Sequence, residues 1–147
     1  MGGIFDKESP ERVRMAESLL SAINAGTYEG FISLLTLEEI SRAPERIRDA
    51  LSARIADSGL SVVDETEDSV ELARVYVHEG AVPAKYYDDA RHLAIGVFRD
   101  MDYIISWNYA HMVNISVRRI LYGVNVRMGY HPVDVVSPEE VSGSGEA

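Results

Sequence analysis

The sequence predicts an α/β fold in which a short, mostly parallel sheet lies between layers of helices. Two observations predict it. Short apolar runs rich in β-branched residues recur along the chain, and longer stretches with helical periodicity separate them. Parallel neighbouring strands need such helical crossovers, and the helices then cover both faces of the sheet. We therefore expect a three-layer α/β/α sandwich, and the length of 147 residues fits a single domain.

Capping residues and glycines mark where the helices begin and end. Ser9 and Pro10 open the first helix, which we expect to end near Ala25, before Gly26. Further helices are expected over residues 36–43, 44–59, 66–80, 84–101 and 116–129. Strands are expected at about 31–35, 60–64, 103–106 and 133–136, and a short helical turn follows over 137–141. We expect one domain over residues 1–141 and a disordered tail over residues 142–147.

The composition excludes several classes of protein. The chain has no cysteine, so it has no disulfide, thiolate zinc site or thiol nucleophile, which fits a reducing cytoplasm. It has no apolar run of the roughly 18 residues that a membrane helix needs, and no signal-peptide pattern. The formal net charge is −10, from 14 basic and 24 acidic residues. Nucleic-acid chemistry would therefore need a local basic patch or a bound cation, whereas a basic protein partner suits the acidity.

Polar residues follow several of the expected strands. Functional groups of a parallel α/β sheet collect where its strands end, so we expect residues 36–39, Asp64 and residues 106–108 on one rim. Carboxylate and amide oxygens are hard ligands that favour Mg²⁺ or Mn²⁺. No His or Cys spacing typical of a zinc site is present.

Two adjacent aspartates at the start of the helix at 84–101 differ in their expected surroundings. On a helical wheel, Asp88 points almost opposite the apolar stripe, so we expect it to be a charged side chain exposed to solvent. Asp89 lies at the boundary between the stripe and water, beside Leu93, where a half-desolvated carboxylate gains from a cation. Both aspartates also lie in the first turn, where the helix dipole favours negative charge. The alternative interpretation of Asp89 is therefore that it only stabilises the start of the helix.

Glu39 and Asn108 have alternative interpretations as well. Thr36 and Glu39 have the spacing of a capping box, with Thr36 as the N-cap, so Glu39 is a candidate for capping as well as for metal binding. The amide of Asn108, directly after a strand, can donate or accept a hydrogen bond or weakly ligate a hard cation.

Three blocks, "ISLLTLEEI", "YYDDARHLAIG" and "DYIISWNYAHMVN", carry a family resemblance. In their order and spacing they resemble PIN-domain proteins, most closely the prokaryotic group related to Vap-type toxin ribonucleases, from about Gly2 to Val141. The resemblance implies a parallel sheet in an α/β/α sandwich and Mg²⁺- or Mn²⁺-dependent cleavage of RNA. Glu39 and Asp89 match the family's metal-binding acids, and Asn108 stands where many members have a further aspartate. Homodimerisation follows only by analogy.

The resemblance also shows one departure from the family. Members normally open with a strand that ends in an aspartate, before a segment like "FDKE" at residues 5–8. This chain resembles the family only from about Gly2 onward, where "GGIFDKES" matches the residues just after that strand, and Asp6 is not taken as the missing aspartate. We therefore expect the strands at 31–35 and 103–106 to pair directly, or residues 1–6, a second copy or a partner peptide to replace the missing strand.

Two functions follow as hypotheses. The first is a PIN-domain ribonuclease, related to the toxin of a toxin–antitoxin pair, that binds its metal weakly and is impaired by loss of the first metal-binding aspartate. The second is a non-catalytic PIN-like module that binds a basic partner protein such as an antitoxin. A small-molecule-binding domain is disfavoured, because no glycine-rich phosphate loop follows any strand.

Overall fold

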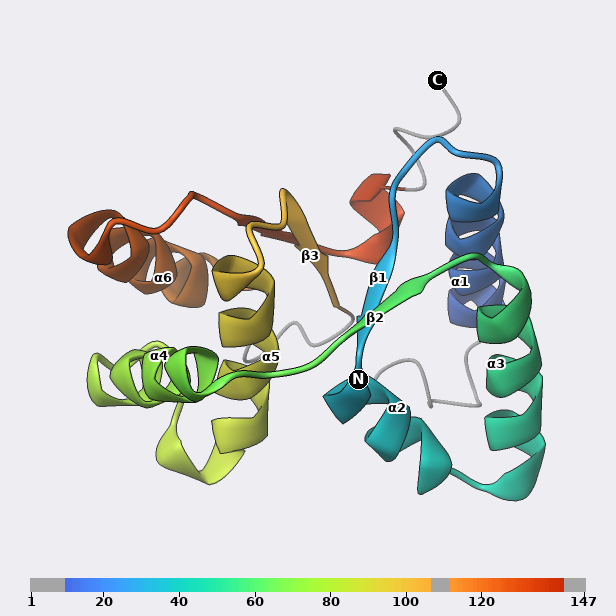
Figure 1. The fold of residues 1–147 in the computed structure, drawn as a ribbon, viewed down its shortest axis with the longest axis horizontal. Helices are drawn as coiled ribbons and strands as arrows, with labels where there is room; N and C mark the ends of the chain where they lie inside the picture. Colours follow the sequence, from blue (N-terminus) through green and yellow to red (C-terminus); the bar gives the residue numbers. More distant parts are fainter. Residues whose placement is uncertain (1–9, 107–111, 142–147) are drawn as a thin grey trace. The chain divides into compact units, whose positions relative to one another are not determined.

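The chain forms two compact units in a computed structural model that describes residues 10–106 and 112–141. The first unit comprises residues 1–64 and 138–147, and the second comprises residues 65–137. Figure 1 shows the helices and strands of both units. Each unit is described by itself below.

The first unit combines helices with one pair of parallel strands. Its elements are α1 (Pro10–Asn24), β1 (Phe31–Ser33), α2 (Leu34–Ser41), α3 (Glu45–Asp57) and β2 (Ser61–Val63), followed by a helical turn at 138–141. β1 pairs with β2 in parallel, with Phe31 opposite Ser61. Gly30 allows the chain to pass close to its neighbours, because a Cβ there would lie 2.5 Å from Cδ2 of Leu60 and 2.7 Å from Cγ2 of Ile23.

The second unit holds most of the buried core. Its elements are α4 (Glu67–His78), the 3₁₀ turn η2 (Ala84–Tyr86), α5 (Tyr87–Phe98), β3 (Tyr103–Ile105), α6 (Ile115–Met128) and β4 (Asp134–Val136). β3 and β4 pair in parallel, with Tyr103 opposite Asp134. The core lies between α4, α5, α6 and β4, and its members include Leu72, Tyr76, Leu93, Val97, Leu121, Val124 and Val135.

The α/β class and the parallel pairing of the strands are confirmed. The helices and strands lie close to their expected positions, and the expected helical turn is present at 138–141. The pairing expected between the strands at 31–35 and 103–106 is not among the strand pairs of the described residues, which form two two-stranded sheets. The three-layer sandwich and the single domain over residues 1–141 stay predictions. None of the helices that the structure describes is long and apolar enough to cross a membrane.

Candidate functional site

Glu39 lies in the second turn of α2, and it is not a capping residue. The helix begins three residues earlier than expected for a Thr36 cap, because Ser33 is the N-cap and its side chain accepts a hydrogen bond from the backbone N–H of Thr36 at 3.0 Å. The prediction of a capping box between Thr36 and Glu39 is therefore wrong. Thr36 is instead a buried residue whose hydroxyl accepts from Ser33, and the side chain of Glu39 is half-buried.

Asp89 lies in the first turn of α5, as expected, and it is half-buried at the edge of the core. Its neighbour Ala90 is fully buried, whereas Asp88, on its other side in the sequence, is exposed. The carboxylate of Asp89 forms no hydrogen bond or ion pair with any residue in the described ranges. A half-desolvated carboxylate without a protein partner gains from a cation, so this position suits a metal ligand.

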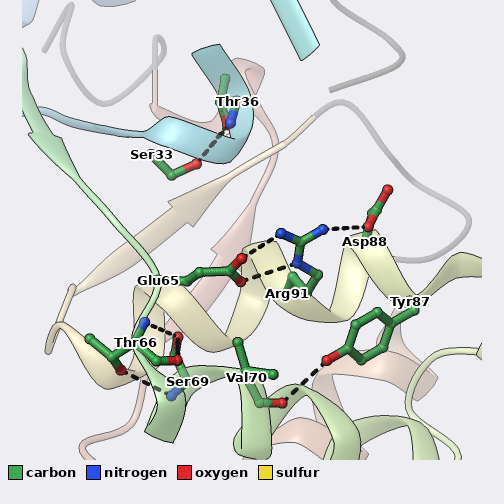
Figure 2. Close-up of polar contacts among 9 residues, drawn as sticks. All are labelled: Ser33, Thr36, Glu65, Thr66, Ser69, Val70, Tyr87, Asp88 and Arg91. Atoms are coloured by element: carbon green, nitrogen blue, oxygen red, sulfur yellow. Dashed lines mark hydrogen bonds and ion pairs between the residues drawn. The ribbon is translucent and has the colours of Figure 1, made fainter. Parts of the chain in front are cut away.

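Arg91 pairs with two nearby carboxylates, those of Glu65 and Asp88, as Figure 2 shows. Its Nε donates to Oε2 of Glu65 at 3.1 Å, its Nη2 donates to Oε1 of the same carboxylate, and its Nη1 donates to Asp88 at 2.8 Å. The side chains of Arg91 and Glu65 are 24% and 23% exposed. The hydrogen bonds to Glu65 raise the pKa of the Arg91 guanidinium, so it stays charged. Arg91 therefore pairs with both Glu65 and Asp88, and it forms no ion pair with Asp89.

The sequence did not predict that Arg91 binds both Glu65 and Asp88. The spacing of Asp88 and Arg91, three residues apart on a helix, is a signal that could have found half of it. Nothing in the sequence links Glu65 to Arg91, because they are 26 residues apart and meet only through the packing of α4 against α5.

Glu65 also borders a hollow over the first turn of α4. The hollow has a volume of about 460 Å³ and is lined by Glu65, Thr66, Glu67, Val70, Glu71 and Arg74. Thr66 caps the helix by accepting from the backbone N–H of Ser69, whose hydroxyl in turn accepts from the N–H of Thr66 (Figure 2). Two of the acidic side chains that line the hollow form ion pairs, Glu71 with Arg74 and Glu65 with Arg91.

Asn108 lies outside the described residues. The strand that precedes it, β3, ends at Ile105, and the following Ser106 is buried, with a hydroxyl that contacts the sulfur of Met112 at 3.4 Å. The structure thus describes two of the three expected metal ligands, Glu39 in the first unit and Asp89 in the second. Across the described ranges, no three His, Asp or Glu side chains are grouped so that they could hold a metal ion. Asp89 fits a hard cation, and a complete ligand set is not present in that part of the chain.

The comparisons with known proteins give no relative. No family model, no curated protein and no solved structure matches the chain.

Proposed function

We propose that the chain is a PIN-type ribonuclease that depends on Mg²⁺ or Mn²⁺ and binds its metal weakly. The observation that carries the proposal is Asp89, a half-buried carboxylate at the start of α5 that forms no ion pair with a described residue, although Arg91 lies two positions away. Its placement agrees with the role that the PIN resemblance implies for it.

The PIN resemblance assigns Glu39 and Asn108 to the same ligand set as Asp89. Glu39 is half-buried, and its helix is capped by Ser33 and not through the expected capping box of Thr36 and Glu39. A bound Mg²⁺ would activate a water molecule and neutralise the charge that develops on the phosphate. Two carboxylates and an amide carry less charge than the three or four acids of the family, so we expect weak binding and slow cleavage.

A non-catalytic role is the second candidate. It is favoured by the lack of a group of three metal-ligating side chains in the described ranges and by the net charge of −10. A chain of this charge would attract a basic protein partner, such as an antitoxin, without any catalysis.

Paired aspartate variants test the first proposal against the second. Single-stranded RNA with a fluorescent label is incubated with the purified chain at millimolar Mg²⁺ or Mn²⁺, and with EDTA. We expect slow cleavage that EDTA abolishes and that Asp89→Asn and Glu39→Gln each reduce by about tenfold or more. The control is Asp88→Asn, because Asp88 is exposed and paired with Arg91, and it should keep the activity.

Two outcomes would contradict the proposal. Cleavage that is equal in Asp88→Asn and Asp89→Asn would place the activity elsewhere. No cleavage with either metal would favour the interaction module.

A further inference from the structure

The outer face of α6 is unusual for a surface helix because it is apolar. Ile115, Tyr122 and Val126 are 71%, 59% and 55% exposed, and Arg119 lies among them on the same side. We call these four residues the α6 outer face. They follow one another at intervals of four, three and four residues, which is the spacing of one seam of a coiled coil.

The opposite side of the same helix already packs into the core. Val117, Leu121 and Val124 are buried there, at most 5% exposed, and they account for the ordinary amphipathic pattern of α6. The α6 outer face is therefore a second apolar stripe, and its residues do not pack into the core. A groove of about 410 Å³ adjoins it and reaches β4 through Arg118, Val133 and Asp134.

The charges around this face indicate what could cover it. α6 carries Arg118, Arg119 and Arg127 and no acidic residue, in a chain whose net charge is −10. Arg118 pairs with Asp134 at 3.0 Å, and Arg127 pairs with Glu79. Arg119 is exposed and forms no ion pair with any residue of the described ranges.

We propose that the α6 outer face binds an amphipathic helix of another protein, one that places a carboxylate between its apolar residues. Covering Ile115, Tyr122 and Val126 removes Arg119 from water, and a charge buried without a partner is strongly unfavourable. The occupant must therefore bring an Asp or Glu opposite Arg119. The inference does not depend on the proposed ribonuclease activity.

Other occupants fit less well. A second copy bound through the same helix has no carboxylate on α6 to offer Arg119. RNA binding through phosphates needs several unpaired cations, and α6 has one. An anionic membrane surface would attract a helix with a row of basic residues, whereas two of these three arginines are already neutralised.

Selection from a displayed peptide library tests the proposal. The library consists of helical peptides of about 18 residues, or five turns, with apolar residues fixed at heptad spacing and all other positions randomised. It is selected on the full chain. We expect enriched peptides to carry Asp or Glu at the position opposite Arg119. A labelled synthetic copy of an enriched peptide should bind at least tenfold more weakly to Arg119→Glu and to Tyr122→Ala.

A charge swap and a matched control complete the design. The peptide with Lys in place of its carboxylate should bind Arg119→Glu and lose its affinity for the wild-type chain. Arg74→Glu makes the same change of charge on an exposed arginine of α4 and should leave peptide binding unchanged. Circular dichroism spectra should show each variant folded, since Arg119 and Tyr122 are exposed.

Four results would overturn the inference. In the first, no sequence is enriched, or the enriched peptides bind Arg119→Glu and Tyr122→Ala as well as they bind the wild type. In the second, sedimentation shows a dimer that Tyr122→Ala dissociates. In the third and fourth, oligouridine RNA or phosphatidylserine vesicles, in place of the peptides, bind in a manner that depends on Arg119 and Tyr122.

Discussion

One buried hydrogen bond is expected to contribute strongly to the stability of the second unit. Tyr76 on α4 is fully buried, and its hydroxyl donates to Oδ1 of Asn125 on α6, which is also buried. The substitution Tyr76→Phe keeps the ring and removes the hydroxyl, so the apolar packing stays while the amide oxygen loses its donor. A buried acceptor left without a donor costs about 1–3 kcal/mol, and we expect a loss of about 2 kcal/mol in the free energy of unfolding at neutral pH.

The same bond gives the loss a characteristic pH dependence. Burial raises the pKa of the Tyr76 phenol above its ordinary value of 10.0, and the hydrogen bond to Asn125 opposes this only in part. The folded chain keeps the proton at a pH where the unfolded chain has released it. The stabilisation is therefore complete below the unfolded pKa and declines as the pH rises above it. Between about pH 9 and about pH 11 the wild type should lose about 1.4 kcal/mol relative to Tyr76→Phe.

Urea titrations followed by circular dichroism measure both effects. The difference between wild type and Tyr76→Phe should fall from about 2 kcal/mol near pH 9 to about 0.6 kcal/mol near pH 11. Tyr122→Phe is the control, because it removes the same hydroxyl from a ring on α6 that is 59% exposed, and it should change the stability little at any pH. A difference that is constant across this pH range, or a loss at neutral pH no greater than that of the control, would refute the reasoning.

Further predictions concern helix packing, helix capping and metal binding. Gly96→Ala on α5 would place a Cβ 2.6 Å from Cδ1 of Ile104, so we expect it to cost about 1–3 kcal/mol, measured by thermal unfolding. Gly123→Ala, with no heavy atom within 4 Å of the added Cβ, should be neutral or stabilise by up to about 1 kcal/mol, and equal losses in both would contradict this packing. Ser33→Ala removes the N-cap of α2 and should cost about 1 kcal/mol, whereas an unchanged melting temperature would show that the cap contributes nothing. Calorimetry should find Mg²⁺ affinity no tighter than millimolar, and micromolar binding that Asp89→Ala abolishes would show that the ligand set is stronger than we infer.

The sequence predicted the local elements because local rules determine them. The apolar periodicity located the helices and the strands within a few residues, and glycines with positive φ at 26, 59, 80 and 129 follow the helices that they were expected to end. The error at α2 is equally local. Both Ser33 and Thr36 are good capping residues, and the strand stops after Ser33, so the earlier one caps the helix.

Contacts between distant segments could not be predicted in this way. Tyr76 and Asn125 are 49 residues apart and meet only because α4 and α6 share a core. A tyrosine on an apolar stripe indicates burial but does not indicate which polar group will meet its hydroxyl. Which strand pairs with which could not be predicted either, because apolar runs of similar length and composition do not indicate their neighbours in the sheet.

The candidate site depends on both kinds of information, and the two aspartates of α5 show how. Asp88 and Asp89 are chemically identical and adjacent, yet one helical step of about 100° directs them to different surroundings. The wheel alone predicted that Asp88 is exposed and Asp89 is at the edge of the core, and both are confirmed. The helical wheel could not predict that Arg91 would pair with Asp88 and not with Asp89. Arg91 also pairs with Glu65, which lies just before α4. Asp88 therefore has an ion-pair partner on its own helix, and Asp89 has none among the described residues. This difference makes Asp88→Asn a matched control for Asp89→Asn in a test of metal binding.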